Sequence, residues 1–209
     1  MRLPLHIGVI PDGNRRWAVS QGMTKEKGYA PGLTPGLMLF KLCEQAGIKE
    51  LTYYGFTKDN TKRPAVQREA FTQACIDAVK MLANENASLL VAGNYSSPMF
   101  PKELLPYTKR RNFGNGGLKV NFLVNYSWEW DLNYYNQEQS SSERINTWDI
   151  SRVDLIIRWG GRRRLSGFLP VQSVYSDFYI IDEYWPDFKP EHFSNALKWY
   201  DRQDVTLGG

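Results

Sequence analysis

The sequence predicts an α/β fold class, with a single domain and a central, mostly parallel sheet of six strands flanked by helices. Two observations support this prediction. Short apolar runs alternate along the chain with longer amphipathic stretches, which is the order of elements in parallel sheets covered by helices. A length of 209 residues suits one well-buried core, and no linker, repeat or low-complexity tract divides residues 1–209 into two domains.

The individual elements are predicted from the spacing of apolar residues and from turn-forming residues at their ends. The six strands are Leu5–Ile10, Glu50–Phe56, Ala87–Ala92, Leu118–Val124, Val153–Ile157 and Phe178–Ile181. The three long helices are Pro35–Ala46, Ala65–Ala83 and Pro190–Tyr200. Gly47 follows the first of these helices and favours a C-terminal stop there. The polar segment Asn136–Thr147 is expected to be a mobile loop.

Composition and charge narrow the class of protein. A net charge of +4 suits an anionic small ligand but is too small for a protein that tracks a polynucleotide, so no nucleic-acid partner is expected. No apolar run is long enough to cross a membrane and no signal-peptide pattern is present, which predicts a cytoplasmic protein. Cys43 and Cys75 lack the spacing of a metal site. Buried free thiols are favoured over a disulfide or a metal site.

Polar residues collect directly after the predicted strands. Because the carboxyl ends of parallel strands meet at one edge of a sheet, these residues are expected to share one rim, where such sheets bind ligands. The rim set comprises Asp12, Asn14, Arg15, Arg16, Thr57, Asn60, Lys62, Arg63, Asn125, Arg158, Arg162, Arg163, Arg164 and Ser166.

The residue types at this rim indicate a diphosphate ligand. Planar guanidinium groups bind phosphate oxygens with two hydrogen bonds, and the start of a helix after Gly13 would add backbone N–H donors. A carboxylate beside phosphates repels them unless a divalent cation lies between. Mg²⁺ commonly uses one or two carboxylates together with phosphate oxygens, and Asp12 is the best candidate for that role.

Each of these residues also has a structural alternative. Asp12 in PDGN is a common turn former, and the run Arg162–Arg164 resembles a solvated basic loop. Thr57 and Asn60 are typical helix caps. Their shared position on one rim favours the ligand-binding interpretation.

Four separated blocks of the sequence resemble the motifs of the cis-prenyltransferases, the undecaprenyl diphosphate synthase family. HIGVIPDGNRRWA resembles H-x-x-x-I-M-D-G-N-x-R-W-A, and LTYYGFTKDNTKRP resembles L-T-x-Y-x-F-S-x-E-N-W-x-R-P. NFLVNYSWEWDL resembles the block around N-Y-G-G-R, and VDLIIRWGGRRRLSGFL resembles D-L-x-I-R-T-x-G-E-x-R-L-S-N-F-L. The blocks occur in the family's order and span most of the chain.

The resemblance implies an enzyme that joins an allylic isoprenoid diphosphate to isopentenyl diphosphate, or to a second five-carbon diphosphate, and releases diphosphate. It implies Mg²⁺ as cofactor, a homodimer, peripheral membrane contact at most, and a hydrophobic tunnel for the chain. The metal ligands would be Asp12 and Asp177. The catalytic residues would be Asp12, Asn14, Arg16 and Asn60. The diphosphate-binding residues would be Gly13, Arg15, Arg16, Lys25, Arg63, Arg158, Arg162, Arg164 and Ser166. The substrate pocket would contain Trp17, Tyr29, Phe56, Thr57 and Trp159.

Several positions depart from the family's pattern. Tyr29 stands where the family usually has histidine. Arg162 stands in place of a carboxylate, and we hypothesise that it adds positive charge for a diphosphate; the alternative is that Arg162 and Arg163 point into solvent. Thr206 replaces an arginine of the family's tail, which predicts the loss of one contact between subunits.

The remaining departures bear on the product and on the reaction. The large Trp159 and a short region between residues 136 and 152 predict a short-chain or irregular product, as in the lavandulyl-type branch of the family. One alternative is a terpene synthase or cyclase that ionises a single prenyl diphosphate. Another is a non-catalytic accessory subunit, against which the retained arginines and Asp12 argue.

Overall fold

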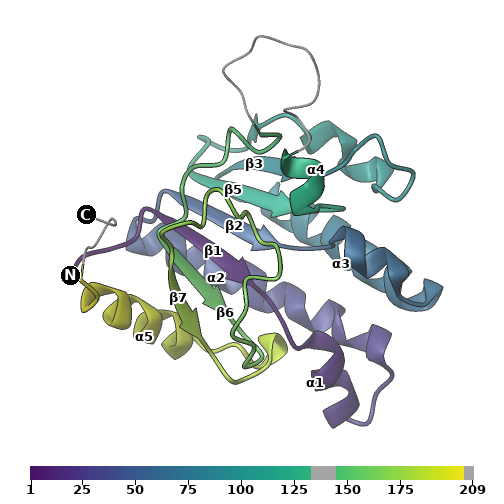
Figure 1. The fold of residues 1–209 in the computed structure, drawn as a ribbon, viewed down its shortest axis with the longest axis horizontal. Helices are drawn as coiled ribbons and strands as arrows, with labels where there is room; N and C mark the ends of the chain where they lie inside the picture. Colours follow the sequence, from purple (N-terminus) through teal and green to yellow (C-terminus); the bar gives the residue numbers. More distant parts are fainter. Residues whose placement is uncertain (133–144, 205–209) are drawn as a thin grey trace.

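A seven-stranded sheet forms the centre of the computed structural model, which describes residues 1–132 and 145–204 (Figure 1). The strand order is β4-β3-β5-β2-β1-β6-β7. The strands are β1 (His6–Ile10), β2 (Glu50–Tyr54), β3 (Ala87–Ala92), β4 (Arg111–Asn112), β5 (Leu118–Leu123), β6 (Leu155–Arg158) and β7 (Asp177–Ile180). The six predicted strands are present and parallel, so the mostly parallel α/β class is confirmed.

The predicted number of six strands is wrong by one. β4 is only two residues long, runs antiparallel to β3 and pairs with Ser88 and Leu89. Its sequence is Arg-Asn, and both residues are exposed, so no run of apolar residues marks it as a strand. A strand of this kind forms through pairing with its neighbour, and no local signal marks it.

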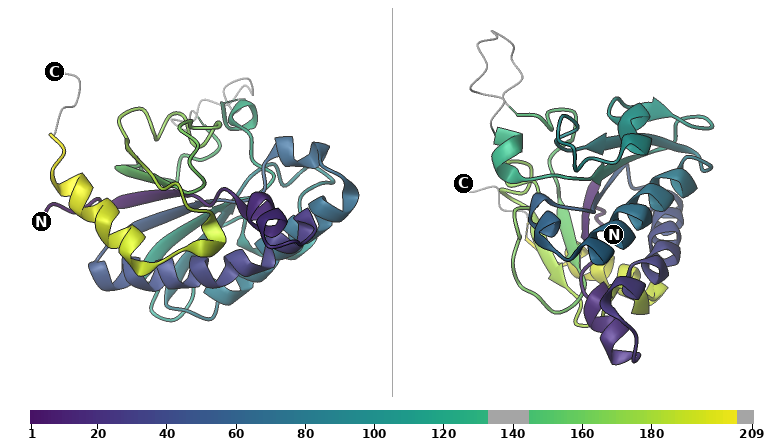
Figure 2. Two further views of the ribbon diagram at one scale, coloured as in Figure 1. Left: turned by 90° about the horizontal axis from the view of Figure 1, so that it is seen from below. Right: turned by 90° about the vertical axis from the view of Figure 1, so that its right-hand side faces the viewer.

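Three long helices cover one face of the sheet (Figure 2). They are α2 (Leu33–Ala46), α3 (Ala65–Leu82) and α5 (Pro190–Asp201), and all three match the predicted helices. The shorter helices and turns are α1 (Asn14–Ser20), α4 (Trp128–Leu132), η1 (Lys25–Gly28), η2 (Ala30–Gly32), η3 (Lys58–Lys62), η4 (Lys102–Tyr107) and η6 (Trp185–Asp187). Gly47 ends α2 with a φ of 77°, as predicted. Within residues 1–132 and 145–204, no helix is both long and apolar enough to cross a bilayer.

The core is split between the two faces of the sheet because successive side chains of a strand point to opposite sides. Leu155 and Ile157 of β6 pack under the helices, and Ile156 packs on the other face with Phe168 and Leu169. Loops and α4 cover this second face (Figure 2). The sheet therefore has one helical cover, and its carboxyl edge stays open to the loops that follow β1, β2 and β6.

The predicted buried, unpaired cysteines are confirmed. Cys43 and Cys75 are both buried and free. Burial raises the pKa of Cys75 to about 12, and it raises the pKa of Cys43 as well. Both thiols are therefore protonated and poorly nucleophilic at neutral pH.

The predicted loop Asn136–Thr147 falls mostly outside the described residues, and so does the tail position Thr206. Thr147, at the end of the predicted loop, is buried. Its backbone N–H and hydroxyl donate to the carboxylate of Asp131 at 2.9 and 2.8 Å. This contact joins Thr147 to the end of α4.

Candidate active site

A polar cavity of about 860 Å³ opens at the carboxyl ends of β1, β2 and β6. These strands are parallel neighbours, so the loops that follow them meet at the same edge of the sheet. Most residues predicted for the site line this cavity. They are Asp12, Gly13, Asn14, Arg15, Arg16, Lys25, Tyr29, Thr57, Asn60, Arg63, Arg158, Arg162, Arg164 and Ser166. The chain thus brings them together, and their chemical roles stay predictions.

Asp12 takes part in an ion-pair network in this cavity. Its Oδ2 accepts a hydrogen bond from Nη2 of Arg158 at 2.8 Å, and its Oδ1 lies 3.4 Å from Nη2 of Arg16. The backbone N–H of Gly13 donates to Oδ1 at 2.6 Å, in a turn that the φ of 102° at Gly13 permits. Burial alone would raise the pKa of Asp12, but the hydrogen bond and charge of Arg158, with the charge of Arg16, outweigh burial and lower the pKa. Asp12 is therefore ionised at neutral pH.

Arg158 joins Asp12 to the loop that follows β6. Its side chain is only 4% exposed. Its Nη1 donates to Oγ of Ser166 at 2.9 Å and to the carbonyl oxygen of Arg164. Ser166 has a φ of 55°, which is uncommon outside glycine, and its carbonyl oxygen accepts from Oη of Tyr54 at 2.7 Å. These contacts hold the loop that follows β6 beside Asp12. The loop carries the hydroxyl of Ser166 and further arginines.

A second group of cations comes from α1 and from the residues before α3. Nη1 of Arg63 donates to Oη of Tyr29 at 3.0 Å, and the ring of Tyr29 stacks on Phe71 with centroids 4.6 Å apart. Nη1 of Arg15 donates to Oε1 of Gln67 at 3.3 Å. Burial and the nearby charge of Arg15 lower the pKa of Arg63. An anion that contacts both guanidinium groups would reduce their mutual repulsion.

Thr57 and Asn60 have the capping role that the sequence left open, and their role toward a ligand stays a prediction. The backbone N–H of Thr57 donates to Oδ1 of Asn60 at 2.9 Å, so this pair caps the η3 turn. Both residues also line the polar cavity. A capping role therefore does not remove them from the site.

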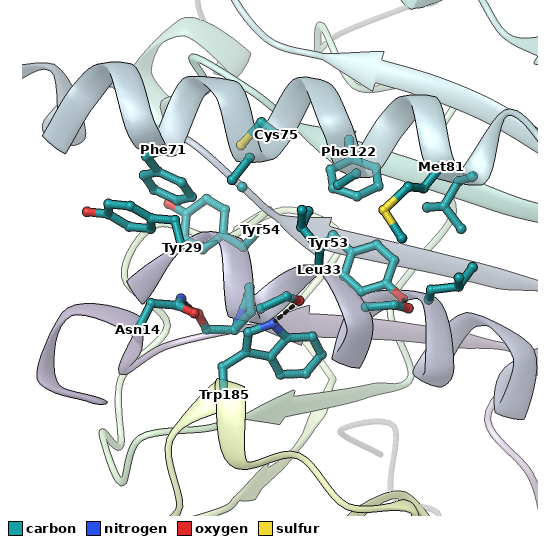
Figure 3. A pocket seen from close by; sticks show the side chains of 18 residues that line it. Asn14, Tyr29, Leu33, Tyr53, Tyr54, Phe71, Cys75, Met81, Phe122 and Trp185 are labelled. Carbon is teal, nitrogen blue, oxygen red and sulfur yellow. Dashed lines mark hydrogen bonds between the residues drawn. The ribbon is translucent and has the colours of Figure 1, made fainter. Parts of the chain in front are cut away.

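An apolar pocket of about 80 Å³ lies beside the polar cavity (Figure 3). It is formed mainly by α2, α3, β2 and β5, through Leu33, Gly36, Leu37, Tyr53, Ala74, Cys75, Ala78, Met81, Leu82 and Phe122. Six residues line both spaces: Pro11, Asn14, Tyr29, Tyr54, Gly55 and Phe71. At this junction Oδ1 of Asn14 is buried and has no hydrogen-bond partner among the described residues. A cationic cavity that leads into an apolar pocket matches a ligand with an anionic head and a hydrocarbon tail.

A family model described as a putative undecaprenyl diphosphate synthase matches residues 10–208. The chain belongs to this prenyltransferase family. It is 32% identical to a ditrans,polycis-undecaprenyl-diphosphate synthase of Buchnera aphidicola, over 98% of this chain and 91% of the relative. It is 30% identical to the corresponding Escherichia coli enzyme, over 98% of this chain and 89% of that enzyme. A crystal structure of lavandulyl diphosphate synthase from Lavandula x intermedia, in complex with dimethylallyl diphosphate, has the same fold. It has a TM-score of 0.83, 22% identity and 99% coverage of both chains.

Trp159 does not line the cavity of this prenyltransferase, so its predicted place in the substrate pocket is wrong. Arg158 faces the cavity, and side chains alternate along a strand, so Trp159 points to the helical face. It is fully buried there, its ring centroid lies 4.7 Å from that of Trp185, and its Nε1–H donates to His192 at 3.2 Å. Trp159 therefore does not line the space for substrate itself, but it packs behind Trp185, which lines the apolar pocket.

Two further predicted pocket residues lie outside both spaces. Phe56 is 1% exposed and packs edge-on against Phe71, so it supports the wall of the pocket from behind. Trp17 points away from the cavity and donates its indole N–H to Oδ1 of Asp187 at 2.8 Å. Arg163 is exposed and does not line the cavity either, whereas Arg162 does.

Asp177 is not part of the site in this chain, and the prediction that it shares a metal with Asp12 is wrong. Asp177 begins β7 and pairs with Leu155 at the start of β6. The cavity lies at the other end of these strands, beside Arg158. Among residues 1–132 and 145–204, no cluster of three or more histidine, cysteine, aspartate or glutamate side chains forms.

The sequence reasoning missed three aromatic residues of the cavity, Tyr54, Phe71 and Tyr184. The guanidinium carbon of Arg16 lies 5.1 Å from the centroid of the Tyr184 ring, and a Cβ at Gly13 would collide with that ring at 2.6 Å. Tyr184 thus supports Arg16 and requires glycine at position 13. The place of Tyr184 just after the last strand was the available signal, because the residues of the cavity follow the carboxyl ends of the strands.

Proposed function

We propose that this chain is a Mg²⁺-dependent prenyltransferase that joins an allylic isoprenoid diphosphate to isopentenyl diphosphate, or to a second five-carbon diphosphate, and releases diphosphate. The observation that carries the proposal is the continuity of the arginine-rich cavity with the apolar pocket through six shared residues. The guanidinium groups suit the diphosphates, and the pocket suits the hydrocarbon chain. Membership of the prenyltransferase family supports the same reaction class.

The residues of the cavity match the charges that develop in this reaction. When the allylic C–O bond breaks, its electron pair stays on the departing diphosphate and the hydrocarbon becomes an allylic cation. Cations such as Arg16 and Arg63 stabilise the diphosphate as its negative charge grows. Aromatic rings at the junction, such as Tyr29 and Phe71, exclude water from the allylic cation and offer it their π-faces.

Asp12 fits a single-carboxylate Mg²⁺ site. A carboxylate offers about four lone-pair positions, and three donors from Gly13, Arg16 and Arg158 occupy part of them. Mg²⁺ commonly takes its other ligands from phosphate oxygens and water. When bound, Mg²⁺ would offset the negative charge of the departing diphosphate. The ionised state of Asp12 at neutral pH suits this role.

A short product is supported by the size of the apolar pocket. Its volume of about 80 Å³ is well below the roughly 300 Å³ at the lower end of small-molecule sites. A short prenyl chain fits such a space better than a long polyprenyl chain.

A homodimer is part of the proposal. Val171, Val174 and Tyr175 are 46%, 66% and 52% exposed, and they precede β7, which forms one edge of the sheet. A second copy of the chain is the occupant that we propose for this surface. Sedimentation equilibrium should give twice the chain mass of 24.2 kDa, and a mass of 24.2 kDa at micromolar concentration would contradict the dimer. The cytoplasmic location stays a prediction from the sequence, and the two buried, unpaired cysteines suit a reducing compartment.

Product analysis by mass spectrometry tests the proposed reaction. The purified protein is incubated with Mg²⁺ and a labelled allylic diphosphate of five, ten or fifteen carbons, with and without isopentenyl diphosphate. A product lengthened by five carbons only when both substrates are present supports the prenyl transfer. An alcohol or a cyclic hydrocarbon from one substrate alone would identify a terpene synthase instead. No turnover of any combination would favour an accessory subunit.

Arg162→Ala is expected to raise the KM for a diphosphate substrate about 10-fold, because a charge-assisted hydrogen bond is lost. Arg162 lines the cavity. Arg163→Ala is the matched control, since Arg163 is also exposed but lies outside the cavity. Steady-state kinetics with each substrate varied in turn measure both variants. Equal effects of the two substitutions would show that only the general positive charge of the loop matters.

A further inference from the structure

Gly36 occupies a place in α2 where neither backbone geometry nor close packing requires glycine. It is not among the glycines with positive φ, and a Cβ at this position would meet no atom within 4 Å. Gly32 differs, because a Cβ there would lie 2.8 Å from the indole ring of Trp185. Glycine inside a helix is less stable than alanine, so α2 contains a destabilising residue that its local surroundings do not explain.

The space beside Gly36 belongs to the apolar pocket. Leu33, Gly36 and Leu37 are separated by three and four positions, which places them on one helix face, and all three line the pocket. The facing helix α3 contributes the small residues Ala74 and Ala78 to the same pocket. The pocket therefore exists where two helices present small side chains or none.

A pair of aromatic rings from β2 and β5 also lines the pocket. The rings of Tyr53 and Phe122 are stacked with centroids 5.0 Å apart. Oη of Tyr53 donates to the carbonyl oxygen of Gly36 at 2.7 Å and so connects β2 to α2. In Figure 3, Tyr29, which also borders the polar cavity, lies at one end of the pocket, and Phe122 and Met81 lie toward the other end. A hydrocarbon chain that enters beside Tyr29 would extend toward Phe122 and Met81.

We propose that Gly36 is a specificity-determining residue that sets the longest allylic chain the pocket admits. Because it has no side chain, it leaves room for the isoprenoid carbons of the substrate. In a pocket of about 80 Å³, each added methyl group removes a large share of the space. The identity of the ligand rests on the proposed function, whereas the limit on chain length rests on the pocket.

Isothermal titration calorimetry with non-reactive allylic thiolodiphosphates of five, ten and fifteen carbons tests this role in the full chain with Mg²⁺. Gly36→Val is expected to weaken binding of the fifteen-carbon analogue at least about 10-fold relative to the five-carbon one, because its methyl groups fill the pocket. Gly36→Ala should give a smaller loss and raise the Tm by about 2–4 °C. Phe122→Val removes ring atoms from the lining of the pocket. This variant should therefore bind the fifteen-carbon analogue more tightly relative to the five-carbon one.

Thr34→Ala is the matched control, because Thr34 is exposed on the same helix and lies outside the pocket. It should leave the ratio of the three affinities unchanged. A Gly36→Val variant that binds all three analogues with unchanged ratios would overturn the proposal. Length-dependent binding without any transfer product from the wild-type protein would reject the proposed reaction and leave the role of Gly36 standing.

Discussion

Asp12→Asn is expected to lower the rate of prenyl transfer by about 100- to 1,000-fold, the range found when one group that stabilises developing charge is removed. Asparagine has nearly the same volume and keeps an oxygen acceptor for the N–H of Gly13. It removes the negative charge that pairs with Arg158 and Arg16 and that the proposed Mg²⁺ site requires. The measurement is kcat with a labelled allylic diphosphate at saturating substrates and Mg²⁺.

Asp59→Asn is the matched control for this substitution. Asp59 also lines the cavity, but its carboxylate pairs with Lys62 at the exposed surface, where an ion pair contributes little. Its kcat should stay within about 2-fold of the wild-type value. Comparable losses in both variants would mean that the total charge of the cavity, and not the position of Asp12, controls the reaction.

Asp12→Asn is also expected to have a pH-dependent effect on the free energy of unfolding. The arginines hold the pKa of Asp12 below its ordinary value of 3.8, so its ionised form favours the folded state. This contribution is fully present above pH 3.8 and is lost as the pH falls through the lower pKa of the folded state. Urea unfolding of wild type and Asp12→Asn should therefore differ most near neutral pH, and the difference should shrink below about pH 4. A constant difference would contradict the lowered pKa.

Arg158→Met is expected to lower both stability and activity. Arg158 is almost fully buried and donates to Asp12, Ser166 and the carbonyl of Arg164. Methionine fills part of the volume but leaves these three acceptors without their donor, so the free energy of unfolding should fall by about 1–3 kcal/mol. Prenyl transfer should fall about 100- to 1,000-fold, because a diphosphate-binding cation is removed and the loop after β6 is released.

Two companion variants make this prediction specific. Arg158→Lys keeps the charge but not the planar fork, so it should recover stability only in part. In the double variant Asp12→Asn with Arg158→Met, the two activity losses should be far from additive, because the residues contact each other directly. Additive losses would indicate that the two side chains act on different steps. Urea unfolding and kcat/KM for each diphosphate provide the measurements.

The shared rim of the polar residues could be predicted from the sequence, because each strand and its end are marked by a local pattern of apolar residues. Asp12 and Arg158 are 146 positions apart and lie 2.8 Å from each other. Each follows or ends a run that reads as a buried strand, and the rule that parallel strands end at one edge places both residues at the same rim of the sheet. Their direct contact depends on the strand order, in which β1 and β6 are neighbours, and no local pattern gives this order. The residue types indicated a diphosphate ligand, and the family resemblance added the isoprenoid chain.

The errors have equally local causes. The prediction for Trp159 followed the family's motif, in which a small residue stands at this position. Its neighbour Arg158 faces the cavity. Because side chains alternate along a strand, Trp159 points to the opposite face of the sheet. Asp177 precedes the predicted strand Phe178–Ile181, so the strand assignment itself put it at the amino end. At Trp159 and at Asp177, the strand pattern of this sequence agrees with the structure, and the position in the family's motif does not.

Other features depend on contacts that no local pattern reveals. The left-handed backbone of Ser166 is held by Tyr54 and Arg158, and β4 exists only because β3 lies beside it. The open space beside Gly36 likewise depends on the packing around α2, and no local sequence pattern predicts it. Long-range packing decides these positions after the elements have formed.

The position of β1 between β2 and β6 has a consequence for biosynthesis. One of the two partners of this strand is made almost 150 residues after it. At 5–20 residues per second, that delay is roughly 7 to 30 s, during which one row of amides and carbonyls on a strand that is buried in the folded protein stays uncovered in the nascent chain. Shielding by a chaperone over this interval would guard against misassembly of the nascent chain.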